Sequence, residues 1–435
     1  MKQDLSTDRH RDSGNQQTMK RRIGEGSTKC RFCKEDIEHI FVDLGMSPLC
    51  ESYVSFENLN RMEPFYPLRV YVCGKCYLVQ LEEFVKPADI FSEYAYFSSF
   101  SDSWVEHARV YTEKMISRFG LNPMCNIVEV ASNDGYLLKH FVRKGIPVLG
   151  IEPAANVAKT AEKVGVPTVV EFFGEDTSFR LARKGSAADL LIGNNVLAQV
   201  PDINDFVRGM KVLLKPRGVV TLEFPHLVRL MMDNQFDTIY HEHFSYFSFS
   251  VAERIFAEHG ITLFDVEEIP THGGSLRIFG CHEEDGTKQV SDAVAKMRRQ
   301  EEIYGINGLE CYCTFEERVK ETKRKILEFL ISVKRGGKSV VGYGAPGKGN
   351  TLLNYCGIRT DFLDYTVDRN PYKQGKYLPG THIPIHPPER IRESKPDFLF
   401  ILPWNFKEEI MEQMAHVREW GAKFVVPIPE ITVYP

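Results

Sequence analysis

Short apolar stretches alternate with amphipathic stretches over residues 126–225, and no other feature constrains the fold of this chain as strongly. The apolar stretches include NIVEVA, PVLGIEP, PTVVEFF, ADLLIGNNV and GVVTLEFP, and stretches with helical spacing separate most of them. Strands that alternate with helices form a parallel sheet covered by helices. ITLFDVEEI and GSLRIFGCH follow across a loop that contains Gly273 and Gly274. We expect them to form an antiparallel pair at the end of this sheet.

The alternation begins again after residues 314–335, where an amphipathic helix is followed by Gly336 and Gly337. KSVVGYG, DYTVD, DFLFILPW and KFVVPIP are the expected strands of this second α/β unit. A chain of 435 residues is expected to fold as two or three domains. We predict a disordered leader over 1–26, a small metal-binding domain over 27–88, an α/β domain over 89–285 and a second, Rossmann-like α/β domain over 286–435.

The composition is that of a soluble globular protein, with 43% hydrophobic and 26% charged residues. A net charge of −5 argues against a dedicated nucleic-acid binder. No apolar run approaches the roughly 18 residues of a membrane span, and the charged N-terminus does not resemble a signal peptide. We therefore predict a cytoplasmic protein with no nucleic-acid and no membrane partner.

Two C-x-x-C pairs lie in the small domain, at Cys30 and Cys33 and at Cys73 and Cys76. Four thiolates with this spacing form the ligand set of a tetrahedral zinc site, and a closed site of this kind is structural. A domain of this size lacks a large core, and the metal would supply the missing stability. The alternative is a pair of redox-active or merely buried cysteine pairs.

The first α/β unit carries the pattern of a nucleoside site at the carboxyl ends of its strands. Small residues fill the turn after the first strand, and Glu152 ends the next strand, where an acid can accept both ribose hydroxyls. Phe172 and Phe173 end the third strand, where an aromatic residue can cover an adenine. The predicted cofactor-binding residues are Glu129, Ser132, Asn133, Asp134, Gly135, Glu152, Phe172, Phe173, Asn194 and Asn195. The alternative is that Glu152 is a surface acid and the two phenylalanines belong to the core.

The stretch GYGAPGKG, residues 342–349, fits two phosphate-binding patterns. It matches G-x-G-x-x-G, and Asp368 follows near the spacing of about 20 residues expected for a ribose-binding acid, so an NAD(P)-dependent oxidoreductase is the main alternative. It also resembles a P-loop, but Gly349 replaces the serine or threonine that an ATPase needs for magnesium. A zinc-ribbon protein that binds nucleic acid or a partner is a third alternative, which the acidic net charge disfavours.

Tyr240, His241, Glu242 and His243 follow one another just beyond the last parallel strand. Consecutive side chains cannot all face one point, so these four residues do not form a single metal cluster. Tyr240, Glu242 and His243 are expected to line a pocket wall. A histidine of near-neutral pKa beside a carboxylate is suited to general base catalysis. The alternative is an ordinary polar loop.

The acidic residue in the first strand and the antiparallel end of the sheet resemble the class I S-adenosylmethionine-dependent methyltransferase fold. In that fold a glycine usually stands two residues after the acid, whereas Ala131 stands there after Glu129. We expect Ala131 to adopt a negative φ, because alanine tolerates a tight turn in that conformation.

A more specific resemblance comes from six stretches distributed over all three domains. FSEYAYFSSFSDSW, EVASNDGYLLKHF, YHEHFSYFS, HGGSLRIF, GYGAPGKGNTLLNYCGI and VDRNPYKQGKYLPGT resemble the sugar C-methyltransferases that build branched deoxysugars. The likeness covers residues 28–433. It implies a class I methyltransferase Rossmann-like sheet between a zinc domain and a second Rossmann-like domain, S-adenosylmethionine as cofactor, and a monomer.

The resemblance also implies a reaction. The substrate would be a nucleotide-linked 4-keto-deoxysugar, usually a dTDP sugar, whose C3 proton is acidic because the C4 carbonyl can hold the charge as an enolate. His243 matches the family's base, and the C3 carbanion would attack the methyl group of S-adenosylmethionine. Glu242 would orient His243 or contact the sugar. Tyr94 and Tyr240 match pocket tyrosines that can donate hydrogen bonds to the sugar or its enolate.

Under this interpretation the last domain binds the nucleotide end of the sugar substrate. The glycine-rich turn and the helix after it would approach the pyrophosphate, with the positive charge of Lys348 in support. The predicted contacts are Gly344, Ala345, Lys348, Asn370, Lys373, Trp404 and Asn405. The alternative for the later positions is a solvated loop and a core tryptophan.

Overall fold

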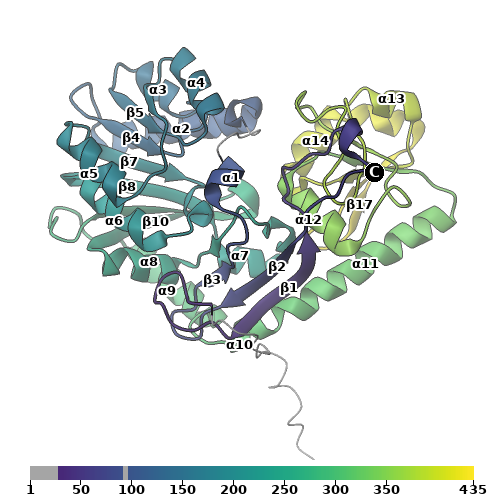
Figure 1. Ribbon diagram of the computed structural model, residues 1–435, viewed down its shortest axis with the longest axis horizontal. Coiled ribbons are helices and arrows are strands. Elements are labelled where there is room, and N and C mark those ends of the chain that lie inside the picture. The colour runs from purple at the N-terminus through teal and green to yellow at the C-terminus, as the bar shows by residue number, and fades with distance from the viewer. Residues whose placement is uncertain (1–27, 92–96) are drawn as a thin grey trace, which may run out of the picture.

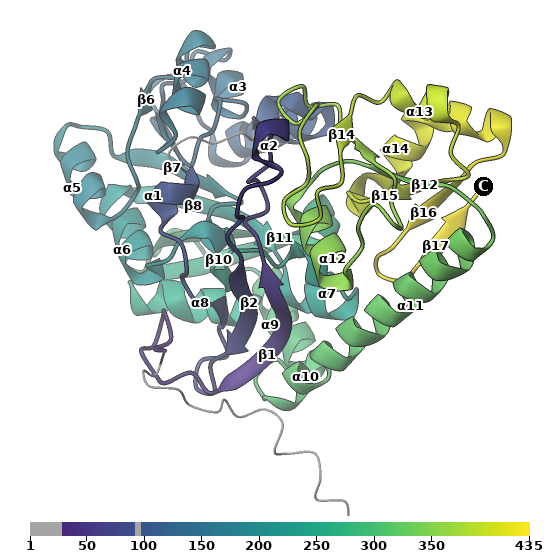
Figure 2. The same ribbon diagram turned by 45° about the vertical axis from the view of Figure 1, so that its right-hand side comes forward.

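A computed structural model describes residues 28–91 and 97–435. The predicted leader and Tyr94 lie outside this part of the chain. Two α/β lobes stand side by side, and the N-terminal strands lie between them at their base (Figure 1). Figure 2 shows these strands in front of the junction, beside helix α12 of the C-terminal lobe.

The N-terminal sheet includes a strand from the middle of the chain. Its order is β1-β2-β3-β9, and each neighbouring pair is antiparallel. The elements are β1 (His39–Ser47), β2 (Tyr66–Val72), β3 (Val79–Leu81), α1 (Pro87–Phe91) and β9 (Ser245–Tyr246).

The N-terminal domain does not build its core alone but shares it with the C-terminal lobe. Phe41 and Val70 belong to the same buried cluster as Leu330 of that lobe. The ring of Phe41 stacks on Phe315, with 4.5 Å between centroids. The core is therefore built from segments that lie far apart in the sequence.

The middle domain is a seven-stranded sheet in the order β10-β11-β8-β7-β4-β5-β6. All neighbours are parallel except those of β11, which pairs antiparallel with β8 and β10, so the predicted class I sheet is confirmed. The strands are β4 (Ile127–Val130), β5 (Val148–Ile151), β6 (Thr168–Val169), β7 (Ala188–Asn194), β8 (Leu214–Pro225), β10 (Ile261–Ile269) and β11 (Ser275–His282). The helices are α2 (Asp102–Phe119), α3 (Leu138–Val142), α4 (Ala155–Lys163), α5 (Glu175–Arg183), α6 (Ile203–Leu213), α7 (Leu227–Met232) and α8 (Phe249–Glu258).

Two boundaries in this domain differ from the sequence-based expectation. Strand β6 is shorter than PTVVEFF, so Phe172 and Phe173 lie in the loop after it. Helix α6 ends at Leu213, because Leu214 already pairs with Ala188 of β7. Pro216 disfavours any helical continuation, since it lacks an N–H and its ring clashes with the preceding turn.

The C-terminal domain is a second α/β unit, with sheet order β14-β13-β12-β15-β16-β17. Its neighbours are parallel except β16 and β17. The helical spacing of KEEIMEQMAHVREWG predicts one helix over residues 407–421, but the structure has α14 followed by a 3-10 helix over Ala415–Trp420. The strands are β12 (Val340–Tyr343), β13 (Thr366–Val367), β14 (Ile385–His386), β15 (Phe398–Ile401), β16 (Lys423–Val426) and β17 (Thr432–Tyr434). The helices are α9 (Asp292–Tyr304), α10 (Glu310–Cys313), α11 (Phe315–Arg335), α12 (Gly347–Cys356), α13 (Arg390–Ser394) and α14 (Lys407–Gln413).

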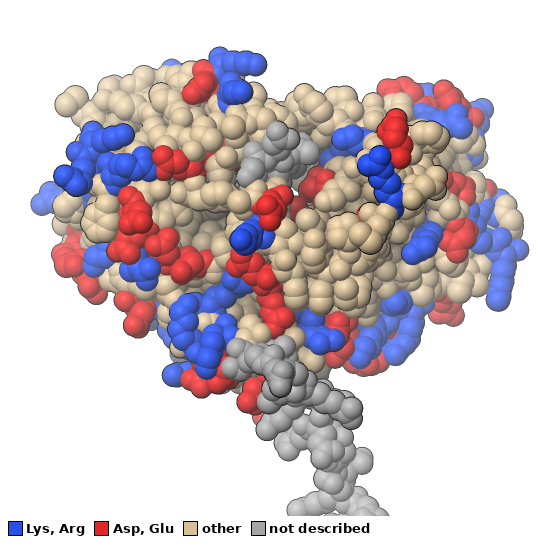
Figure 3. Space-filling view, in the orientation of Figure 1, with Lys and Arg blue, Asp and Glu red and all other residues tan. Residues whose placement is uncertain are grey.

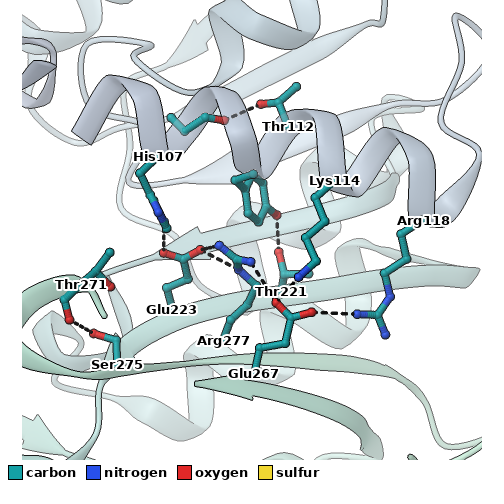
Figure 4. A network of polar contacts seen from close by, with 12 residues as sticks. His107, Thr112, Lys114, Arg118, Thr221, Glu223, Glu267, Thr271, Ser275 and Arg277 are labelled. Atoms are coloured by element: carbon teal, nitrogen blue, oxygen red, sulfur yellow. Dashed lines mark hydrogen bonds and ion pairs between the residues drawn. The ribbon is translucent and has the colours of Figure 1, made fainter. Parts of the chain in front are cut away.

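A buried polar network fastens α2 to the middle sheet (Figure 4). Glu223 of β8 accepts hydrogen bonds from His107 Nε2 at 2.8 Å and Arg277 Nε at 2.7 Å. Burial alone would raise the pKa of Glu223, but the hydrogen bond from His107 and the charge of Arg277 bring it below its ordinary value. The carboxylate is therefore ionised and holds α2 and β11 in fixed positions.

The surface carries charges of both signs. Acidic and basic side chains are mixed on the face shown in Figure 3, without a continuous basic stripe. Among residues 28–91 and 97–435, none of the helices combines the length and apolarity needed to cross a membrane.

Candidate active site

A cavity of about 750 Å³ lies where the three domains meet. The middle domain contributes the carboxyl ends of β4, β5 and β7, the segment that contains His243, and the turn that contains His272. The C-terminal domain contributes the start of α12 and the loop after β15. The N-terminal domain contributes Cys50 and Glu51. The cavity therefore joins the predicted cofactor site, base and nucleotide site.

Six of the predicted cofactor-binding residues line this cavity. They are Asn133, Glu152, Phe172, Phe173, Asn194 and Asn195. Glu152 is buried, and its carboxylate accepts the backbone N–H groups of Asn133 at 3.0 Å and Ala154 at 2.9 Å. These bonds hold the carboxylate at the cavity wall. Both polar atoms of the Asn194 side chain are buried and have no partner within the described residues, so they can bind a ligand there.

The other four predicted cofactor-binding residues do not line the cavity. They are Glu129, Ser132, Asp134 and Gly135. Asp134 accepts the backbone N–H of Ser99 at 3.0 Å and its hydroxyl at 2.5 Å, so it holds the turn before α2. Burial, and then the charge of Glu152, raise the pKa of Glu129 well above its ordinary value. Glu129 is therefore a neutral buried acid in β4, behind the cavity wall.

The expected conformation of Ala131 is wrong, because its φ is 54°. This left-handed conformation suits glycine, whereas alanine is strained there by its Cβ. Asn133, two residues later in the same turn, also has a positive φ, of 50°. The loop after β4 therefore keeps the backbone path of a glycine-rich turn without a glycine at its first position.

Ala131→Val is expected to lower the free energy of unfolding by about 1–3 kcal/mol, because a β-branched residue is more strained than alanine at positive φ. Ala131→Gly is the control and is expected to unfold within about 1 kcal/mol of the parent. Denaturant unfolding of the three proteins measures the difference. A parent-like midpoint for Ala131→Val would contradict the left-handed assignment.

His243 is held in one tautomer with a free nitrogen. Its Nδ1 lies 3.0 Å from the carbonyl oxygen of Thr238, and because a carbonyl only accepts, Nδ1 carries the proton and donates it. Nε2 is then unprotonated. The ring packs on Tyr240, with 4.1 Å between centroids. Burial lowers the pKa of His243 to about 4, so the imidazole is neutral at physiological pH.

The partner that orients His243 differs from the one expected from the sequence. The Thr238 carbonyl fixes the ring, whereas Glu242 accepts a hydrogen bond from Cys50 Sγ at 3.3 Å. Glu242 and Tyr240 both line the cavity. His241 does not line it, and its Nε2 lies 3.2 Å from the carbonyl oxygen of Pro67 in the N-terminal domain.

Lys348 brings a positive charge into the cavity from the first turn of α12. Its Nζ donates to Asn405 Oδ1 at 2.7 Å and lies 4.6 Å from the centre of a Trp404 ring. Trp404 in turn donates through Nε1 to Asp237 Oδ2 at 2.7 Å. Burial lowers the pKa of Lys348 to about 8. Lys348 and Asn405 line the cavity, but Trp404 supports them from behind.

The remaining predicted nucleotide contacts lie in the segments that follow β12 and β13. Lys373 lines the cavity and donates to the carbonyl oxygen of Ala345 at 2.9 Å. Gly344 and Ala345 do not line it. Asn370 does not line it either and accepts the backbone N–H of Tyr372 at 2.9 Å within its own turn.

The N-terminal domain covers the start of α12, where a dinucleotide pyrophosphate would lie in an NAD(P) enzyme. A Cβ placed on Gly347 would lie 3.0 Å from Cys50 Sγ and 3.8 Å from Glu51 Oε1. Asp368, the acid expected to bind the ribose, instead accepts the backbone N–H groups of Ala345 at 2.7 Å and Asn370 at 2.8 Å. Both features disfavour the oxidoreductase hypothesis.

The four cysteines of the N-terminal domain converge on one point. Their sulfur atoms all lie within 4.8 Å of one another, and the Cys30–Cys76 and Cys33–Cys73 separations are both 3.5 Å. A tetrahedral ion with metal–sulfur bonds of about 2.3 Å separates its ligands by roughly 3.8 Å. The arrangement therefore fits a structural zinc ion, as the spacing predicts, and leaves no ligand position for a substrate.

The metal site is connected to the His243 segment through β3. Gln80 donates through Nε2 to Cys30 Sγ at 3.2 Å and pairs with Ser245 in β9. The backbone N–H of Leu81 donates to the carbonyl oxygen of Phe244, the residue after His243, at 2.9 Å. The zinc site thus supports β9, the strand that follows His243.

Several cavity residues with polar or aromatic side chains were not identified from the sequence, and four of them bear on the chemistry. They are Cys50, Glu51, Trp104 and His272. Cys50 and Glu51 lie in an unremarkable loop, and only domain docking brings them to the cavity. His272 does carry a sequence signal, because it precedes Gly273 and Gly274 in a stretch that forms part of the family resemblance.

Comparison with known proteins gives three family matches in chain order. A zinc binding domain profile matches residues 30–91, a methyltransferase domain profile matches 104–266, and a C-methyltransferase C-terminal domain profile matches 270–429. The C-methyltransferase NovU of Streptomyces niveus is 36% identical over 402 residues, which are 92% of this chain and 96% of that protein. The ubiquinone biosynthesis O-methyltransferase of Bartonella bacilliformis is 26% identical over 105 residues, which are 23% of this chain and 42% of that protein.

Solved structures of methyltransferases resemble part of this chain at low overall similarity. An S-adenosylmethionine-dependent methyltransferase from Clostridium acetobutylicum is 10% identical, with a TM-score of 0.34, over 41% of this chain and 92% of its own. The magnesium protoporphyrin IX methyltransferase of Synechocystis is 12% identical, with a TM-score of 0.32, over 41% of this chain and 79% of its own.

Proposed function

Because this chain belongs to the family of S-adenosylmethionine-dependent C-methyltransferases, we propose that it methylates C3 of a nucleotide-linked 4-keto-deoxysugar, with a dTDP sugar as the first candidate. One observation carries the proposal. A single cavity holds an imidazole with an unprotonated nitrogen, the strand ends of a methyltransferase sheet and two lysines from the C-terminal domain. A small anionic substrate with an acidic C–H group matches these three features.

We assign the cofactor to the carboxyl ends of β4, β5 and β7. S-adenosylmethionine, when bound, supplies an electrophilic methyl group. Glu152 would accept hydrogen bonds from its ribose, and the partnerless amide of Asn194 would bind its polar groups. Phe172 and Phe173 would cover the adenine from the loop after β6.

His243 is the proposed base. A proton on C3 of a 4-keto sugar is acidic because its electron pair can pass to the C4 oxygen. Nε2 of His243 would take this proton, while Nδ1 keeps its hydrogen bond to Thr238. Tyr240 and Glu242 would bind the sugar from the same wall. Tyr94 keeps its proposed role as a hydrogen-bond donor, although it lies outside the described residues.

The C-terminal domain would bind the diphosphate of the substrate. Lys348 and Lys373 line the cavity, and a lysine ammonium group is suited to phosphate. We further propose a monomer that acts in the cytoplasm without nucleic-acid or membrane partners. The monomeric state, the cytoplasmic location and the lack of such partners are predictions from the sequence.

The direct test is incubation of the protein with S-adenosylmethionine and a panel of 4-keto nucleotide sugars, read by mass spectrometry. The expected product carries one added methyl group, and its position at C3 is assigned by NMR. Matched sugars reduced at C4 are the control and should not react, because they cannot form the enolate. Methylation of the reduced sugars, or stabilisation of the protein by NAD and not by S-adenosylhomocysteine, would overturn the proposal.

The pH dependence of kcat/KM is expected to have widely separated limbs. Because burial lowers the pKa of His243 to about 4, the base is neutral and active at every higher pH. Because burial lowers the pKa of Lys348 to about 8, its positive charge is lost as the pH rises through that value. Activity should therefore rise through about pH 4, stay level, and fall through about pH 8.

Lys348→Arg is the control for the alkaline limb. Arginine stays protonated up to a pH of about 12, so this variant should keep its activity where the parent loses it. An acid limb near the ordinary histidine value of about 6.5 would contradict the lowered pKa of His243. An unchanged alkaline limb in Lys348→Arg would remove Lys348 as its source.

A further inference from the structure

His272 occupies a strained backbone conformation at the cavity. Its φ is 56°, between a proline-led turn and two glycines that also have positive φ, at 88° and 114°. A histidine in the left-handed region is uncommon, and such strain is found chiefly at functional sites where the surroundings enforce it. The strained turn comprises residues 271–274, between β10 and β11.

Contacts from three other segments hold this turn in place. The carbonyl oxygen of Gly273 accepts Gln235 Nε2 at 2.7 Å, and that of Gly274 accepts the backbone N–H of His226 at 3.1 Å. A Cβ on Gly273 would lie 2.5 Å from the Trp404 ring, so only glycine fits there. The turn is thus enclosed by the middle and C-terminal domains, and His272 cannot relax by shifting its backbone.

The His272 ring is placed by the polar network of α2. It meets the Trp104 ring edge-on, with 5.1 Å between centroids, and Trp104 stacks on His107 at 4.9 Å. His107 is itself fixed by the buried carboxylate of Glu223 at 2.8 Å. Figure 4 shows His107 and Glu223 beside Thr271, the first residue of the turn, and Ser275, the residue that follows it. The orientation of the His272 imidazole is therefore set by Trp104, His107 and Glu223, which lie outside the turn.

The two ring nitrogens of His272 lie in different surroundings. Nδ1 is buried and has no hydrogen-bond partner among the residues described. A buried N–H group without an acceptor destabilises the folded protein. If Nδ1 carries no proton, no buried donor is left without an acceptor. We therefore place the proton on Nε2, which is not among the buried side-chain atoms that lack a partner. His272 itself lines the cavity.

The charge state agrees with this assignment. Burial, and then the charge of Lys348, lower the pKa of His272 to about 3, so the ring is neutral. His272 and His243 both line the same cavity. His243 offers a bare nitrogen to it, whereas His272 offers an N–H.

We propose that His272 donates a hydrogen bond from Nε2 to the C4 oxygen of the sugar, and that this bond strengthens when the oxygen becomes an enolate. The inference rests on the proposed function. His243 takes the C3 proton, the C3–H electron pair forms the C3–C4 double bond, and the carbonyl electron pair moves to the C4 oxygen. The enolate electron pair then forms the C3–methyl bond while the sulfur–methyl bond of S-adenosylmethionine breaks, and that bond's electron pair passes to sulfur to leave S-adenosylhomocysteine. The C4 carbonyl is restored, and His272 keeps its proton throughout.

A neutral donor is suited to this step. A neutral imidazole has a higher pKa for losing its N–H than an imidazolium, so it can polarise a carbonyl without transferring its proton. A fixed donor aimed at developing charge contributes about 10²–10³-fold to turnover. The strained turn would therefore hold the donor in place before the charge develops.

The test separates proton removal from methyl transfer. Exchange of the C3 proton with deuterium oxide is followed by NMR in the absence of S-adenosylmethionine, for the full-length parent, His272→Gly and His272→Asn. His272→Gly removes the imidazole and also relieves the positive φ, so it should unfold no more easily than the parent. We expect exchange to fall about 10²-fold or more in His272→Gly and less in His272→Asn, which tolerates the same φ and retains an N–H donor.

S-adenosylhomocysteine affinity distinguishes this role from a structural one. It should stay within about twofold of the parent in both variants, because a donor to the C4 oxygen does not hold the cofactor. Exchange in His272→Gly within about threefold of the parent would overturn the inference, as would loss of exchange together with weaker cofactor binding and easier unfolding. If the parent neither exchanges nor methylates any 4-keto sugar, the proposed function itself fails, and that result is distinct.

Discussion

His243→Asn is expected to lower kcat for methyl transfer by about 10²–10⁴-fold, the range of general base catalysis. Asparagine can keep the hydrogen bond to the Thr238 carbonyl, which the imidazole makes at 3.0 Å through Nδ1. It has no basic nitrogen to replace Nε2. The C3 proton would then be lost only to water or to a weaker base. Steady-state kinetics with the sugar identified by mass spectrometry measures the effect.

The neighbouring histidine provides a matched control. His241 lies two residues earlier, does not line the cavity and contacts the Pro67 carbonyl instead. His241→Asn should therefore keep kcat within a few-fold of the parent, although it removes the same functional group from the same segment. A His243→Asn protein with near-normal turnover would exclude His243 as the base, and equal losses in the two variants would indicate a structural effect.

Cys73→Ser is expected to release the zinc ion and lower the free energy of unfolding by more than about 4 kcal/mol, a magnitude typical of a lost metal site. The zinc ion connects the two cysteine pairs, which are otherwise connected through the short strands of the N-terminal sheet. The loss should also reduce turnover about tenfold or more, because Gln80 joins a metal ligand to β9, which follows His243 in the chain. Metal analysis, thermal unfolding and kinetics measure the three effects.

Cys125→Ser is the control for a thiol outside the metal cluster, and it should retain one zinc ion per chain and near-parental turnover. Chelation of the parent protein should reproduce the Cys73→Ser effects, and added zinc should reverse them. A zinc-free Cys73→Ser protein with parental stability and turnover would show that the metal supports neither the fold nor the site.

Periodicity and spacing were sufficient for the order of the elements. The seven-stranded sheet, its antiparallel end and the convergence of Cys30 and Cys33 with Cys73 and Cys76 follow the sequence-based expectation. Boundaries were less accurate where tertiary pairing competed with local preference, as at Leu214, which joins β8 instead of extending α6. The φ of Ala131 was predicted with the wrong sign, because the turn geometry overrides the preference of alanine.

The residues that line the cavity were harder to predict from the sequence. Glu129 and Asp134 stand in the expected motif, but the sheet and the turn before α2 enclose them. Cys50 and Glu51 come from a domain that was assigned only a metal, and they cover the start of α12. Long-range docking decides such positions, and no local pattern encodes it.

The sequence by itself determined the class I sheet, the second α/β unit, the four metal ligands and the family. These features depend on which residue types recur along the chain and at what spacing, and both can be read directly from the sequence. Only the tertiary structure decided which nitrogen of His243 is free, which acids face the cavity and why the turn at His272 is strained. Those properties depend on the Thr238 carbonyl, on the Glu223 network and on the packing of three domains. Hydrogen bonds and steric contacts set them, from Thr238 five residues before His243 as well as from distant segments, and these contacts exist only once the chain has folded.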